Sequence, residues 1–76
     1  MKHPKDIQAF GKHLRKIRLE RNLSQQHLAD MANVPKITIQ RIELAKYSIK
    51  LDTLISISKA LEISLSEIVA YSNNPE

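Results

Sequence analysis

The chain has 76 residues and no cysteine, which limits it to one small domain and excludes a disulfide framework or a thiolate metal site. No apolar run approaches the ~20 residues of a membrane-spanning helix, and residues 1–10 lack the apolar stretch of a signal peptide, so we expect a cytoplasmic protein. The net charge is +4, and residues 1–50 hold eleven of the twelve Lys/Arg but only four of the eight Asp/Glu. This clustering of positive charge favours a polyanionic partner; alternatively, the cations only solvate helix faces.

Five helical patterns follow one another along the chain, and no segment alternates convincingly as a strand, so the sequence predicts an all-α fold. The first helix is expected at about residues 6–21, where Ile7, Phe10, Leu14 and Ile17 recur at spacings of three and four. This spacing forms one apolar stripe along the helix. Residues 1–5 are expected to be a flexible N-terminal arm.

The second helix is expected to begin after Ser24, a good N-cap residue. It is expected to end at Asn33, because asparagine tolerates the left-handed conformation that often follows a helix. Its inward face is predicted to consist of Leu28, Ala29 and Ala32. The third helix is expected to follow after a very short turn and to run to residue 43.

The third helix has unequal sides. Only Ile39 and Ile42 are expected to face inward, with Val34 before the helix packing beside them. Its β-branched run, residues 37–39, has weak intrinsic helix preference, so inward packing must hold the helix. The outward side carries residues that a segment with a purely structural role would not need, which suggests a recognition surface.

Two further helices are expected in the C-terminal third. The fourth is predicted at residues 51–61, with Leu54, Ile57 and Leu61 facing inward. Ser64 and Glu67 have the spacing of a capping box, which predicts a short fifth helix that ends near residue 70. Residues 6–71 are therefore expected to form one domain, and residues 72–76 a frayed tail.

Several residues occur in an order and spacing that resemble the Cro/C1-type, or XRE, helix-turn-helix family over about residues 10–70. They are Arg18, Leu23-Ser24-Gln25, Leu28-Ala29, Ile39, Arg41-Ile42-Glu43, Leu54 and Leu61. The resemblance implies a compact five-helix bundle of the lambda-repressor-like DNA-binding type, with the helix-turn-helix formed by the second and third helices. In this family the third helix enters the DNA major groove.

The resemblance assigns the outward residues of the third helix to base reading. They are Pro35, Lys36, Ile37, Thr38, Gln40 and Arg41. Arg41 can donate two hydrogen bonds to guanine, or alternatively bind a phosphate. Lys36 fits a base or, somewhat better, a phosphate. Ile37 fits a thymine methyl group, and equally well a lone exposed side chain that needs no explanation.

The resemblance also implies a set of phosphate contacts and one structural ion pair. The phosphate candidates are Ser24, Gln25, Lys46, Ser48 and Lys50. Those at the start of the second helix would use its free N–H groups and positive dipole. The ion pair would join Arg18 and Glu43 and fix the third helix.

Three positions depart from the family pattern. Asn33 and Ala45 stand where the family usually has glycine, and Ile49 stands where it often has proline. Asparagine replaces glycine easily, but alanine does not readily adopt positive φ, so we expect the loop after the third helix to follow a different path.

The function implied is that of a small homodimeric repressor which reads a short palindrome. The candidate dimer residues are Ile49, Ile55, Leu65, Val69 and Tyr71. An alternative is an antitoxin or other protein-interaction module of a toxin–antitoxin pair that also binds DNA. A neighbouring toxin gene would favour this alternative.

An enzyme is not expected. His3, His13 and His27 are scattered, lack metal-ligand spacing and have no clustered carboxylates beside them. No glycine-rich phosphate loop and no nucleophile–base pair occur. We therefore expect no cofactor, no metal and no domain for a small-molecule ligand, and we expect double-stranded DNA as the partner.

Overall fold

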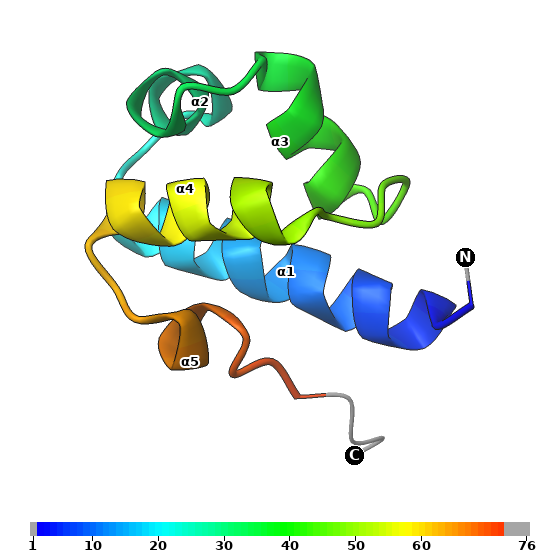
Figure 1. Ribbon diagram of the computed structural model, residues 1–76. Coiled ribbons are helices and arrows are strands. Elements are labelled where there is room, and N and C mark those ends of the chain that lie inside the picture. Colours follow the sequence, from blue (N-terminus) through cyan, green and yellow to red (C-terminus); the bar gives the residue numbers. More distant parts are fainter. Residues whose placement is uncertain (1, 73–76) are drawn as a thin grey trace.

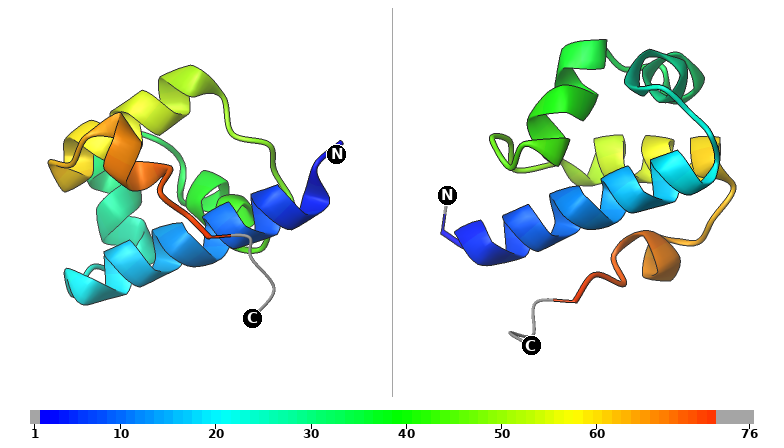
Figure 2. Two further views of the ribbon diagram at one scale, coloured as in Figure 1. Left: turned by 90° about the horizontal axis from the view of Figure 1, so that it is seen from below. Right: turned by 180° about the vertical axis from the view of Figure 1, so that it is seen from behind.

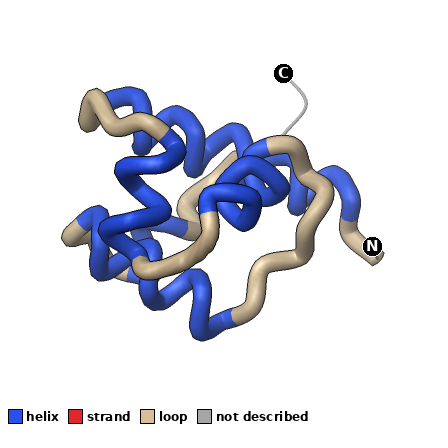
Figure 3. Tube along the Cα trace, turned by 90° about the horizontal axis from the view of Figure 1, so that it is seen from above, coloured by secondary structure: helices blue, strands red, loops and turns tan. Residues whose placement is uncertain are grey.

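The computed structural model describes residues 2–72, which form five helices and no strand (Figure 3). The helices are α1 (Pro4–Glu20), α2 (Gln25–Ala32), α3 (Lys36–Glu43), α4 (Leu51–Leu61) and α5 (Leu65–Ile68). The all-α expectation is therefore confirmed for the described chain. Helix α1 begins two residues earlier than expected, because Pro4 has the fixed φ that suits a first helical turn. The predicted arm thus overlaps α1, and positions 73–76 of the predicted tail lie outside the described residues.

The helices are arranged so that α2 and α3 lie on one side of α1 and α4, and α5 lies on the other (Figures 1 and 2). Helix α2 packs against both α3 and α4, and α3 also packs against α1. Helix α3 is therefore held from two sides while the rest of its surface remains open.

One apolar core joins all five helices. Its fully buried large side chains are Leu14, Leu28, Ile39, Ile42, Ile57 and Ile68. All of these except Ile68 lie on faces that the spacing of apolar residues marked as inward. Leu54, also expected inward, is half-buried and packs against this core. Burying such side chains contributes roughly 1.5–3 kcal/mol each, which is the main source of stability in so small a domain.

The ends of α2 follow the expected capping chemistry. The Ser24 hydroxyl accepts a hydrogen bond from the backbone N–H of His27 at 2.9 Å. At the other end Asn33 adopts φ 58° and ψ 45°, the left-handed conformation. Because a left-handed residue turns the chain sharply at the end of a helix, only residues 33–35 separate α2 from α3.

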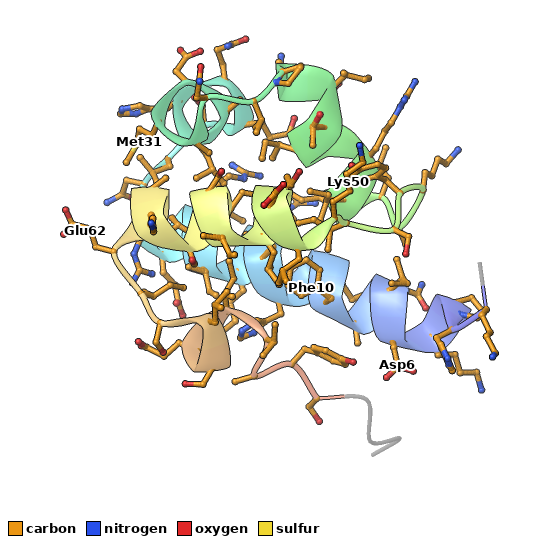
Figure 4. All side chains as sticks on the ribbon, in the orientation of Figure 1. Asp6, Phe10, Met31, Lys50 and Glu62 are labelled. Carbon is orange, nitrogen blue, oxygen red and sulfur yellow. The ribbon has the colours of Figure 1, made fainter. Side chains whose placement is uncertain are left out.

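The C-terminal segment is anchored to α1. Ser64 and Glu67 form the predicted capping box at the start of α5, which is one turn long and ends at Ile68. Beyond it, Tyr71 donates a hydrogen bond to Asp6 at 3.1 Å, and this bond raises the pKa of Tyr71. Asp6 lies on the side of α1 that faces this segment (Figure 4). The Tyr71 ring also meets Phe10 edge to face, so chain beyond α5 closes one end of the core.

The loop between α3 and α4 differs from the sequence expectation. Ala45 adopts φ 59°, the left-handed conformation, although it is not glycine. The loop therefore keeps the turn that glycine would make, instead of avoiding it. The next residue, Lys46, donates its backbone N–H to the Arg41 carbonyl at 2.8 Å.

Replacing Ala45 with glycine should stabilise the domain by about 1 kcal/mol, because glycine removes the steric cost of positive φ. Urea denaturation measures this as a higher transition midpoint at unchanged slope. Asn33→Gly is the matched control, and its effect should be much smaller, since asparagine already tolerates this conformation. Equal effects at both positions would contradict the strain at Ala45.

Candidate nucleic-acid interface

The two sides of helix α3 differ sharply in their exposure to solvent. Ile39 and Ile42 are buried, while Lys36, Ile37 and Arg41 are exposed. Ile37, the second residue of α3, is 48% exposed. The other predicted base-reading residues are placed as follows: Pro35 is exposed, and Thr38 and Gln40 are half-buried. The outward side therefore combines two cations, one apolar side chain and two neutral polar groups.

The start of α3 is open to an approaching ligand. Pro35 is the N-cap residue, in extended conformation, and it supplies no side-chain hydrogen bond to the helix. Its carbonyl accepts the N–H of Thr38 at 3.0 Å. An end of this kind can enter a groove, because no capping side chain blocks it.

Arg18 of α1, Gln25 of α2 and Glu43 of α3 form one hydrogen-bonded network at the junction of their helices. Arg18 Nε donates to Glu43 Oε2 at 2.7 Å, and Arg18 Nη2 donates to Oε1 at 3.0 Å. Gln25 Nε2 donates to the same Oε1 at 3.0 Å. The remaining Arg18 group, Nη1, donates to the Leu23 carbonyl at 2.7 Å. The structure thus brings the two predicted ion-pair partners together and adds Gln25 to them.

This network is shielded from water, and its buried polar groups all have hydrogen-bond partners. The Arg18 and Glu43 side chains are only 8% and 4% exposed. The hydrogen bonds with Glu43 raise the pKa of Arg18. Within residues 2–72 no buried side-chain nitrogen or oxygen lacks a hydrogen-bond partner. The network therefore fixes the end of α3 relative to α1 and α2 with charge-assisted bonds.

Gly11 lets α1 approach the same end of α3 closely. A Cβ atom at this position would overlap the Ile42 carbonyl oxygen and would lie 3.2 Å from the Glu43 carbonyl oxygen. Gly11 is helical and its φ is not positive, so close approach is its reason here. Sequence reasoning did not give Gly11 a role, although a glycine within an amphipathic helix signals such an approach.

The predicted phosphate contacts lie at two places. Ser24 and Gln25 lie at the start of α2, where the Ser24 hydroxyl is already a cap and the Gln25 amide already binds Glu43. Lys46, Ser48 and Lys50 are exposed along the loop between α3 and α4. Lys50 lies where this loop enters α4 (Figure 4). The loop cations and the outward side of α3 thus belong to adjacent parts of the chain.

The candidate dimer residues fall into two groups. Ile49 and Tyr71 pack against the core of their own chain. Leu65 and Val69 are exposed by 41% and 42%, and Ile55 is half-buried. The second group is thus better placed to meet another molecule.

Other exposed leucines, Leu19 among them, were missed by the sequence reasoning. Leu44 and Leu51, at the two ends of the α3–α4 loop, are 66% and 65% exposed. Leu44 could have been found, because it follows Ile37 by seven residues and Arg41 by three, which places it on the same outward side.

The described residues contain little that suggests other chemistry. In residues 2–72 no group of three His, Cys, Asp or Glu side chains is placed to hold a metal ion. His13 Nε2 donates a hydrogen bond to the Glu67 carbonyl at 3.0 Å. No helix of this part of the chain has both the length and the apolar character needed to cross a membrane.

Comparison with known sequences identifies a family and a relative. A family model described as helix-turn-helix matches residues 14–68. The immunity repressor protein of Bacillus phage phi105 is 39% identical over 59 residues, an alignment that covers 78% of this chain and 41% of that protein. The chain thus spans less than half the length of this relative.

Comparison with solved structures gives the same fold. The restriction-modification controller protein C.AhdI from Aeromonas hydrophila is 27% identical with a TM-score of 0.81, over 83% of this chain and 96% of that one. An HTH_3 family transcriptional regulator from Vibrio cholerae is 29% identical with a TM-score of 0.79, over 86% and 38%. The hypothetical transcription factor NHTF from Neisseria, 17% identical with a TM-score of 0.80 over 86% and 75%, shares the fold.

Proposed function

Because the chain belongs to the helix-turn-helix family of the XRE, or Cro/C1, type, whose members are DNA-binding regulators and not enzymes, we propose that it is a homodimeric transcriptional repressor. It reads a short palindrome in the major groove through α3. The observation that carries this proposal is the outward side of α3, where Lys36, Ile37 and Arg41 are exposed on a helix that a buried ion pair holds in place. Such a rigid surface can distinguish base edges, because its side chains keep a fixed register with the groove.

The size of the domain supports the dimer. Helix α3 has eight residues, a length of about 12 Å, which fits within one major groove. The longest dimension of the domain is 32 Å, and two half-sites are about 34 Å apart from centre to centre. One copy therefore reads one half-site, and a palindrome requires a second copy. Ile55, Leu65 and Val69 are the surface we propose for contact between the copies.

Selection of bound duplexes from a random-sequence DNA pool tests this function. At a stated near-physiological salt concentration, we expect a two-fold motif with half-sites about one helical turn apart. Salt-sensitive binding without any enriched motif would mean that the basic surface binds nucleic acid non-specifically, and it would contradict a repressor. Analytical ultracentrifugation of the bound complex, with two chains expected per duplex, tests the dimer.

Arg41→Ala should relax base preference at one position in each half-site. An arginine that donates two hydrogen bonds to guanine contributes about 1–3 kcal/mol of discrimination. The measurement is competition binding with operators that carry each of the four bases at every position. Arg21→Ala, an exposed arginine in the turn after α1, is the matched control and should leave all preferences unchanged. Uniform weakening by Arg41→Ala, with preferences intact, would instead make Arg41 a phosphate contact.

Lys46→Ala should weaken binding to every duplex similarly, because a phosphate contact carries no sequence information. The slope of log affinity against log salt should fall by about one unit. The matched control is Lys59→Ala, since Lys59 is an exposed lysine in the last turn of α4. An unchanged salt slope for Lys46→Ala would rule out its phosphate role.

A further inference from the structure

The outward face of α1 carries an exposed leucine among three cations. Lys12, Arg15, Lys16 and Leu19 are all exposed, and their spacings of three, one and three place them on one helix face. Leu19 is 51% exposed. With Glu20 at the edge, these side chains line an open depression of about 470 Å³. Because the stems of Lys and Arg are apolar, the depression has an apolar floor and a positive rim.

This face points away from the rest of the domain. Gly11 and Arg18 mark the side of α1 that contacts α3, and Asp6 and His13 mark the side that contacts the C-terminal segment. At 100° per residue, Lys16 lies roughly 140–160° around the helix from Gly11 and Arg18. A duplex bound to α3 therefore leaves most of this face uncovered.

We propose that the outward face of α1 binds an acidic segment of a partner protein that inserts an apolar side chain beside Leu19. Charge complementarity identifies this kind of partner, because three cations surround the depression and only Glu20 opposes them. A phosphate backbone would satisfy the cations but would leave Leu19 without a contact. An acidic segment with an apolar side chain satisfies both, as apolar centres surrounded by charged rims do at protein interfaces. The partner can bind while DNA occupies α3, so this face would link the regulator to another protein.

A pair of synthetic peptides tests the proposal. One is an amphipathic peptide of Glu and Leu, and the other has Ser in place of each Leu. Each is titrated into the isotopically labelled full chain at near-physiological salt while backbone amide shifts are recorded. We expect saturable shifts over residues 12–20 and binding of the Leu peptide that is about tenfold tighter, because one buried leucine accounts for such a factor.

Three variants complete the experiment. Lys12→Glu/Lys16→Glu should lose the acidic peptide and gain a matched peptide of Lys and Leu, which shows that the variant is folded and that charge selects the partner. Leu19→Ser should remove the difference between the Leu and Ser peptides. Lys36→Glu should lose DNA and keep the acidic peptide, so the two surfaces are tested separately.

Four results would overturn the proposal. Two of them are equal affinity for the two peptides and the absence of saturable binding. The third is a set of shifts centred on α3 and the loop that follows it, which would mean that an acidic peptide only imitates DNA. The fourth is a shift of Lys16 and Leu19 on titration with a DNA duplex, which would mean that this face belongs to the nucleic-acid interface.

Discussion

Replacing Glu43 with alanine should lower the free energy of unfolding by about 3 kcal/mol, because it leaves the Arg18 guanidinium buried without its carboxylate. Arg18 would keep only its bond to the Leu23 carbonyl, and Gln25 would lose its acceptor. Urea denaturation measures the loss as a lower midpoint at unchanged slope. Affinity for the selected operator should also fall more than tenfold under conditions where the variant is still folded, since the end of α3 is no longer fixed.

The controls separate a buried pair from surface charge. Glu20→Ala removes an exposed acid at the end of α1 and should change stability by less than about 0.5 kcal/mol. Arg18→Met/Glu43→Leu removes both charges and should be more stable than Glu43→Ala alone, because no buried charge is left unpaired. If the effects of Arg18→Met and Glu43→Leu, each measured alone, simply added to give the effect of the double variant, the network would have no coupling and this account of α3 would be wrong.

Much of the fold could be predicted because local signals agreed with one another. The apolar spacing of α1 gave Phe10, Leu14 and Ile17 as core residues, and they are buried. The capping residues Ser24 and Ser64 marked the starts of α2 and α5 correctly. These signals are local: they depend on residues within two turns of one another, so they can be read before the tertiary structure is known.

The remaining features depend on contacts between distant segments, which periodicity does not report. The Gln25 bond to Glu43 spans 18 residues, and it arises only when α2 and α3 meet α1. The left-handed conformation of Ala45 was not expected, because alanine itself disfavours it. Outward exposure of α3 followed from the pattern, but which of its side chains reads which base depends on a duplex and stays a prediction.

Gly11→Ala should destabilise the domain by about 2 kcal/mol, although alanine is the better helix former. The propensity gain is about 1 kcal/mol, but the added methyl group would overlap the Ile42 carbonyl oxygen, and backbone cannot move aside as a flexible side chain can. Overpacking of this kind costs about 1–3 kcal/mol or more, so the clash outweighs the propensity.

The matched control is Ala9→Gly, two positions earlier in α1, which should lose about 1 kcal/mol through propensity alone. The two variants differ in their effect on DNA: at temperatures where both are folded, only Gly11→Ala should weaken operator binding strongly, because it displaces the end of α3 from α1. A Gly11→Ala protein that is more stable than the parent and binds DNA normally would show that α1 and α3 do not need this close approach.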